Sequence, residues 1–263
     1  MVKNMANGAF QDRLMRCRYE IKYIISQSKA AAIQRFIEPY ISLDRYSKLQ
    51  LKGSYPIVSL YLDSDNLQLC TESLRGVLKR FKLRIRSYSD DPDYPHFFEI
   101  KRRSNTVIIK SRAKVKTQDV PALLSGQYVH PIQNYQDDIN AIKQFQLYMK
   151  SVRAKPVVLV RYMRKAYEGS MENRVRLTFD HQLAYKITTE PHVVFSGNRW
   201  QHNPLTLRNV ILEIKFTGRF PAWLSRMARY FELRQQSVSK YATSMKKACS
   251  LRFCAPKLPV EVF

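Results

Sequence analysis

The segments Arg18-Tyr-Glu-Ile-Lys-Tyr23, Phe97-Phe-Glu-Ile-Lys-Arg102 and Ile211-Leu-Glu-Ile-Lys-Phe216 each contain the tripeptide Glu-Ile-Lys. Side chains alternate between the two faces of a strand, so the Glu and the Lys share one face and the Ile points to the other. Each segment therefore predicts a β-strand with one charged and one apolar face. One such strand is typical of any half-buried sheet, whereas three copies spread over the chain indicate a repeated charged surface.

Further segments show the same alternation and predict more strands with a basic face. In residues 157–167, Arg161 falls on the face of Leu159, whereas Arg164 falls on the face of Tyr162. The other basic faces carry Lys82, Arg84 and Arg86 in residues 81–88, Lys110, Arg112, Lys114 and Lys116 in 106–116, and Arg174 and Arg176 with Asp180 in 174–180.

The remaining segments predict helices and one further, apolar strand. Residues 29–40, for which Ser26-Gln-Ser28 offers an N-cap, and residues 137–152 have apolar side chains at helical spacing. Residues 221–233 and 237–249 predict two more helices near the C-terminus, and residues 57–63 are typical of a buried strand. The absence of a low-complexity linker predicts one domain over residues 1–263, with a core of about 18–247.

The composition indicates a partner with many negative charges. The chain has 45 Lys and Arg residues against 21 Asp and Glu residues, for a net charge of +24. Such a field attracts nucleic acid, an anionic membrane surface or free phosphate chains. With only 7 glycines and no Walker-type loop, the sequence argues against P-loop or Rossmann nucleotide binding. It shows no signal peptide and no long apolar run, which predicts a soluble, cytoplasmic protein.

Two architectures satisfy the pattern of charged strand faces. An open sheet would expose the basic faces to water. Alternatively, helices could cover the apolar faces from outside, so that an antiparallel barrel of about eight strands encloses the charged faces in a wet or anion-filled tunnel. Composition alone leaves both architectures open.

A family resemblance favours the tunnel. Several short motifs resemble those of the vacuolar transporter chaperone (VTC) domain, the polyphosphate polymerase branch of the triphosphate tunnel metalloenzymes (the CYTH-like superfamily). The first Glu of the superfamily's usual Glu-x-Glu-x-Lys is Arg18 here, as in the VTC branch. The motifs occur in the family order over more than 200 residues: Arg18-x-Glu20-x-Lys22-Tyr23, Tyr61-Leu-Asp63, Lys82-x-Arg84-x-Arg86, Phe98-Glu99-x-Lys101-Arg102, Arg161, Glu213-x-Lys215-Phe216 and Ser239-Lys240-Tyr241.

The resemblance implies an α+β fold, an antiparallel barrel with a charged tunnel and helices outside. It implies a polyphosphate polymerase that uses ATP and Mn²⁺ or Mg²⁺ to extend a polyphosphate chain. Glu213 is the best metal candidate, with Glu99 and Glu20 as further candidates and Asp180 as a weaker one, because hard cations prefer carboxylate oxygens. The residues expected to act in catalysis are Lys22, Arg84, Arg86, Lys101, Arg161, Glu213 and Lys215. The residues expected to bind phosphate are the cations of that set together with Lys110, Arg112, Arg174, Arg176 and Lys240.

Two rival functions remain open from the sequence. The same fold could hydrolyse tripolyphosphate or a nucleoside triphosphate, or a non-catalytic domain could bind polyphosphate or nucleic acid. Phe98, Phe179 and Phe216 fall opposite the charged faces, which predicts core positions and argues against sequence-specific nucleic-acid binding. The SPX domain and membrane helices of the fungal polymerases are missing from this sequence, so a membrane-protein partner stays unassigned.

Overall fold

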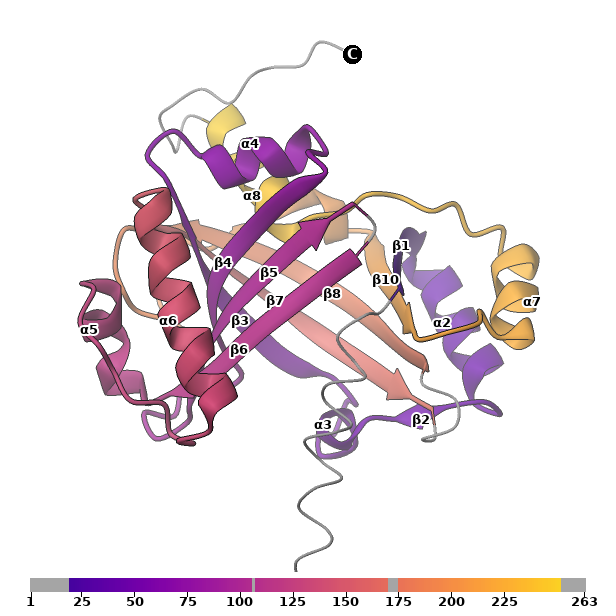
Figure 1. Cartoon of the computed structure of the whole chain (residues 1–263). Helices are drawn as coiled ribbons and strands as arrows, with labels where there is room; N and C mark the ends of the chain where they lie inside the picture. The colour runs from indigo at the N-terminus through magenta and orange to yellow at the C-terminus, as the bar shows by residue number, and fades with distance from the viewer. Residues whose placement is uncertain (1–18, 106, 170–174, 252–263) are drawn as a thin grey trace, which may run out of the picture.

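The computed structural model describes residues 19–105, 107–169 and 175–251 (Figure 1). Arg18 and Arg174 lie outside the described residues. The structure is α+β, with a ten-stranded antiparallel sheet whose main path has the order β1-β10-β8-β7-β3-β4-β5-β6. In chain order these strands are β1 (Tyr19–Ser26), β3 (Tyr55–Asp63), β4 (Lys79–Ser87), β5 (His96–Ser104), β6 (Val107–Val115), β7 (Lys155–Glu168), β8 (Val175–Ile187) and β10 (Asn209–Phe216).

Two short strands and seven α-helices complete the described fold. The strand β2 (Ser42–Leu43) pairs with β7, and β9 (Gln201–His202) pairs with β8. The helices are α2 (Gln27–Ile37), α3 (Arg45–Lys48), α4 (Gln68–Leu74), α5 (Val120–Leu124), α6 (Gln136–Ser151), α7 (Ala222–Tyr230) and α8 (Lys240–Ser250). Within the described ranges, no helix has the length and apolar character needed to span a bilayer.

The sheet curls until its two ends approach each other. Glu20 of β1, at one end of the path, lies 2.9 Å from Lys101 of β5, which is next to the other end. Among the described residues, the edge strands β1 and β6 share no backbone pairing, so the barrel stays open along this line, which we call the seam. The predicted eight-stranded barrel is thus confirmed as a curled, barrel-like sheet that side chains hold together at the seam.

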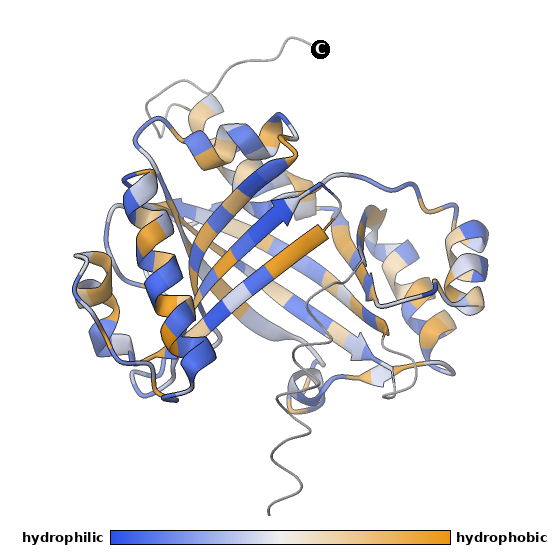
Figure 2. Ribbon diagram, in the orientation of Figure 1, coloured by the Kyte–Doolittle hydropathy of each residue, from blue (hydrophilic) through white to orange (hydrophobic). Residues whose placement is uncertain are grey.

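Helices cover the outer, convex face of the sheet, as the apolar strand faces require. Helices α5 and α6 pack on β3 to β6, where Phe98 contacts Phe145 edge-to-face at 5.0 Å between ring centroids. Helices α2 and α7 pack on β1, β8 and β10, in a core that includes Phe179 and Phe216. Figure 2 shows the resulting alternation of hydrophilic and hydrophobic residues along the strands. The predicted core positions of Phe98, Phe179 and Phe216 are confirmed.

The last helix, α8, lies on the concave face instead. Tyr241 of α8 stacks on Tyr61 of β3 at 4.8 Å between ring centroids and shares a core with Tyr162 and Val160 of β7. These β7 residues alternate with Leu159, which belongs to the outer core. Helix α8 therefore fills one end of the space that the sheet encloses.

A single buried carboxylate fastens α8 and α4 to the sheet. Asp63, at the end of β3, accepts hydrogen bonds from the backbone N–H groups of Ser64, Leu69 and Cys70 at 2.7 to 2.9 Å. It also accepts one from the hydroxyl of Tyr241 at 2.5 Å. Since Asp63 is fully buried, each of these groups depends on it for a partner.

Replacing Asp63 is expected to destabilise the protein strongly. Asp63→Ala leaves buried N–H donors of α4 and the Tyr241 hydroxyl without an acceptor, which predicts a loss of about 2–4 kcal/mol in the free energy of unfolding, measured by urea denaturation. The matched control is Asp65→Asn, because the side chain of Asp65 is 74% exposed and, among the described residues, pairs only with Lys155 at the surface. The control should change stability by less than about 1 kcal/mol. Equal stability of both variants would contradict this role for Asp63.

Candidate active site on the concave face of the sheet

The concave face of the sheet collects almost all of the cations that the sequence singles out. All of these cations except Lys240, which comes from α8, lie on the strand face opposite the outer cores, and each contacts a carboxylate or a hydroxyl group. The structure brings together Lys22, Arg84, Arg86, Lys101, Lys110, Arg112, Arg176, Lys215 and Lys240.

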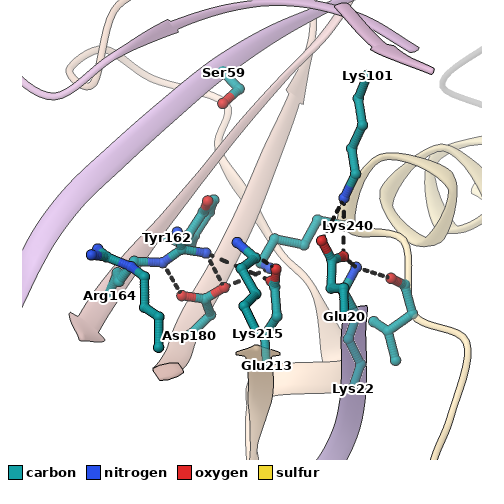
Figure 3. Close-up of polar contacts among 12 residues, drawn as sticks. Glu20, Lys22, Ser59, Lys101, Tyr162, Arg164, Asp180, Glu213, Lys215 and Lys240 are labelled. Carbon is teal, nitrogen blue, oxygen red and sulfur yellow. Dashed lines mark hydrogen bonds and ion pairs between the residues drawn. The ribbon is translucent and has the colours of Figure 1, made fainter. Parts of the chain in front are cut away.

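The most buried group of charges joins β7, β8, β10 and α8 (Figure 3). Arg164 donates to both oxygens of Asp180, at 2.6 Å from Nε and 2.7 Å from Nη2. Lys240 of α8 lies 2.6 Å from Oδ2 of Asp180. Glu213 pairs with Lys215 at 2.7 Å and lies 4.0 Å from Arg164. Two carboxylates and three cations thus form one network beneath α8.

A second group of charges bridges the seam. Glu20 lies 3.0 Å from Lys22 on its own strand and 2.9 Å from Lys101 of β5, which donates to both oxygens of the carboxylate. Lys22 also donates to the backbone carbonyl of Val238 at 3.0 Å. Glu20 therefore connects the two ends of the sheet path, and Lys22 connects them to the segment that leads into α8.

A third group surrounds Glu99 on the β4–β5–β6 side. Its carboxylate lies 2.6 Å from Arg84, 2.6 Å from Lys110 and 3.3 Å from Arg112. The Glu99 side chain is 1% exposed, while the side chains of Lys110 and Arg112 are 45% and 37% exposed. Because one carboxylate holds three cations, this region keeps an excess of positive charge that faces solvent.

Arg86 and Arg176 differ in how they are held. Arg86 donates to the hydroxyls of Ser59 and Tyr162, each at 3.2 Å, and within the described residues it has no carboxylate partner. Arg176 is paired with the buried Asp44 at 2.6 Å. Arg86 is therefore the buried guanidinium most in need of an anionic ligand, since an unpaired buried charge is costly.

The structure places Arg161 away from this site. Arg161 lies on the outer face of β7, where it donates to the carbonyl of Phe195 at 2.6 Å and stacks over Trp200. Its neighbour in register, Val58, belongs to the outer core. The family resemblance selected Arg161, but strand alternation already grouped it with Leu159. The tunnel arginine of β7 is Arg164, and its shared face with Tyr162 was the signal that could have identified it.

Opposing charges and burial shift the pKa values in this site. Burial raises the pKa of Asp180, but Arg164 and Lys240 outweigh it and lower that pKa to about 2. Glu20 is likewise lowered to about 2, because its lysines outweigh burial and the adjacent carboxylate. Burial lowers the pKa of Lys101 to about 8. Asp180 and Glu20 are therefore ionised at neutral pH, and Lys101 loses its charge in the mildly alkaline range, whereas Glu20 raises the pKa of Lys22.

Among the carboxylates, Glu213 best fits a divalent cation. Among the described residues, its Oε2 has only the 4.0 Å contact with Arg164, and the buried hydroxyl of Thr178, its neighbour in register on β8, has no hydrogen-bond partner. Glu20 and Glu99 fit less well, since lysines or arginines occupy their oxygens. No cluster of three or more His, Cys, Asp or Glu residues occurs in the described parts of the chain. A Mg²⁺-like ion would complete its coordination with phosphate oxygens and water.

Comparison with known proteins gives a family and a fold. The family model of the VTC domain matches residues 17–249. A candidate adenylate cyclase from Bacillus halodurans has a similar structure, with a TM-score of 0.51, 14% identity and coverage of 85% of this chain and 94% of that chain. A candidate adenylyl cyclase from Hippeastrum with dominant triphosphatase activity gives a TM-score of 0.49, 14% identity and coverage of 88% and 96%. No curated protein matches the chain significantly in sequence.

The two arginines of β7 provide a direct test of which face forms the site. Arg164→Gln breaks a buried ion pair and leaves Asp180 with Lys240 alone, so we expect a loss of about 3 kcal/mol in unfolding free energy. Tripolyphosphate binding, measured by calorimetry, should weaken at least about tenfold. Arg161→Gln, the matched control on the outer face, should change affinity less than about twofold. Equal weakening by both variants would place Arg161 in the site.

Proposed function

Because the chain belongs to the VTC domain family, we propose that it transfers the γ-phosphoryl group of ATP to the end of an inorganic polyphosphate chain. The observation that carries this proposal is the concave face itself, on which cations outnumber carboxylates and Arg86 lacks a carboxylate partner among the described residues. A linear phosphate chain is a ligand of matching charge and shape for a curled, basic surface.

The proposed reaction needs positioning and charge stabilisation from the protein. A terminal oxygen of the acceptor chain attacks the γ-phosphorus, the bond from that phosphorus to the β,γ-bridging oxygen breaks, and ADP leaves. Arg84 and Arg86 would hold phosphate oxygens through their guanidinium forks. Lys215 and Lys240 would offset the charge that develops between the two chains. A bound Mg²⁺ or Mn²⁺ held by Glu213 would supply Lewis-acid stabilisation of phosphate oxygens.

Helix α8 supports transfer to phosphate rather than to water. It fills one end of the enclosed space, with Tyr241 stacked on Tyr61 and Lys240 bound to Asp180. Excluding water beside the donor phosphate strengthens each electrostatic contact and suppresses hydrolysis. The acceptor must then reach the γ-phosphorus along the basic concave face.

Product analysis separates transfer from hydrolysis. We expect the purified chain, incubated with ATP and Mn²⁺ or Mg²⁺, to produce long polyphosphate and ADP, resolved on a gel stained for polyphosphate. Rapid release of free phosphate without chain growth would instead identify a hydrolase. Binding of polyphosphate without any turnover of ATP would identify a non-catalytic binding domain.

Glu213→Gln tests the proposed metal position. Gln keeps the shape of the side chain but loses the charge that attracts a divalent cation, so we expect turnover to fall at least about 100-fold. Binding of Mn²⁺ in the presence of a non-hydrolysable ATP analogue, followed by electron paramagnetic resonance, should weaken in parallel. Tripolyphosphate affinity without metal should persist, because Lys215 remains. The exposed Glu190→Gln is the control, and unchanged metal dependence in Glu213→Gln would move the metal to Glu20 or Glu99.

A further inference from the structure

A polar pocket opens at the seam, apart from the network around Asp180. It has a volume of about 220 Å³ and lies between β1, β4, β5 and the strap, our name for the residues 235–239 that lead into α8. We call it the seam pocket. Its basic lining residues are Lys22, Arg80, Lys82, Lys101 and Arg103.

The strands β4 and β5 place like charges directly opposite each other in this pocket. Lys82 is in register with Lys101, and Arg80 is in register with Arg103. One step further along the strands, Arg84 faces Glu99 and the charges are balanced. Like charges opposite each other destabilise a sheet. Glu20, which also lines the pocket, pairs with Lys101 at 2.9 Å and offsets part of one pair. Among the described residues, Lys82, Arg80 and Arg103 form no ion pair, so their charges are costly unless a further anion lies over them.

Lys82 is the residue of the pocket that most requires an anionic ligand. Its ammonium group donates to the hydroxyl of Ser239 at 2.7 Å, and within the described residues no carboxylate forms an ion pair with it. Burial, together with the nearby Lys22, Lys101 and Arg80, holds the pKa of Lys82 well below its usual range. A partly buried cation surrounded by cations is stabilised by an anionic ligand, which would also raise the pKa of Lys82.

The strap supplies the remaining polar groups of the pocket. The backbone N–H of Gln236 donates to the carbonyl of Lys22 at 2.9 Å, so the strap covers the free edge of β1. The strap's Ser237 and Ser239 line the pocket, as does Ser73 of α4, whose buried hydroxyl has no hydrogen-bond partner in the described parts of the chain. Hydroxyl donors beside ammonium and guanidinium groups suit phosphate oxygens.

We propose that the seam pocket is the port through which a linear inorganic polyphosphate chain passes, binding the phosphate units that extend beyond the reaction centre. The inference rests on the proposed function for the identity of the chain. Phe81 is the aromatic residue of the pocket, and it packs beside Tyr148 in the outer core. A single-stranded nucleic acid would need exposed aromatic rings for its bases, so a chain without bases fits better.

The experiment compares a long and a short ligand on two lysine variants. Lys82→Met removes the charge in the pocket and keeps the length of the side chain. We expect it to weaken binding of long-chain polyphosphate about tenfold, with a change of less than about threefold for tripolyphosphate, both measured by calorimetry at fixed salt. Lys114→Met, on the same sheet face of β6, is the matched control and should not change the ratio of the two affinities.

Two results would contradict the proposal that the seam pocket is a port. Equal weakening of both ligands would place Lys82 in the triphosphate site, and unchanged affinity for both would leave the pocket without a ligand. A different result would contradict the proposed function, namely that the wild-type chain makes no polyphosphate from ATP. In that case a selective effect of Lys82→Met on long chains would still identify the pocket as a polyphosphate site.

Thermal stability provides a second measurement. Without polyanion, Lys82→Met should melt no lower than the wild type, because it replaces a cation that lacks a counter-ion. Long-chain polyphosphate should then raise the melting temperature of the wild type more than that of the variant. A markedly lower melting temperature of the unliganded variant would indicate a structural lysine instead. If that variant does not fold, Arg80→Gln combined with Arg103→Gln applies the same binding test.

Discussion

The concave face depends on carboxylates that hold cations apart from one another. Glu20, Glu99, Asp180 and Glu213 each contact two or more Lys or Arg side chains, and each comes from a different strand. Without them, the mutual repulsion of buried cations would oppose the curling of the sheet. The same carboxylates leave the cations in surplus, because one acidic group serves several basic ones. The fold is thus stable enough to form and still attracts a polyanion.

The family resemblance predicted that the charged faces line the inside of the barrel, and strand alternation predicted which residues share those faces. Alternation placed Glu20 with Lys22, Glu99 with Lys101 and Glu213 with Lys215, because a period of two is fixed by the backbone. The predicted place of Arg161 in the site was wrong, because the structure puts it on the outer face of β7 with Leu159. The pairing across the seam could not be predicted, since Glu20 and Lys101 are far apart in sequence and meet only when the whole sheet has curled.

The position of α8 could not be predicted from the sequence either. Its apolar residues predict a helix but do not say which face of the sheet it covers. What decides the position is a set of polar contacts at its start: Tyr241 to Asp63, Lys240 to Asp180 and Ser239 to Lys82. Each partner is a single polar residue from a different strand. Such contacts have no periodicity in the sequence, so only the structure reveals them.

The charges of the residue pairs between β4 and β5 change in a regular order along the concave face. Along β4 and β5, starting at the seam pocket, the pairs are Arg80 with Arg103, Lys82 with Lys101, Arg84 with Glu99, and Arg86 with Phe97. The pairs nearest the seam pocket carry only positive charge. The next pair joins a cation to a carboxylate, and the last pair places Arg86 opposite an aromatic ring. Salt screens exposed charges over about 8 Å under physiological conditions, so the outer pairs act on a ligand only once it is near the pocket. In the proposed complex, a phosphate chain within that range is held by ammonium groups and serine hydroxyls at the seam pocket and by oriented guanidinium groups further in, where Arg86 is fixed by Ser59 and Tyr162.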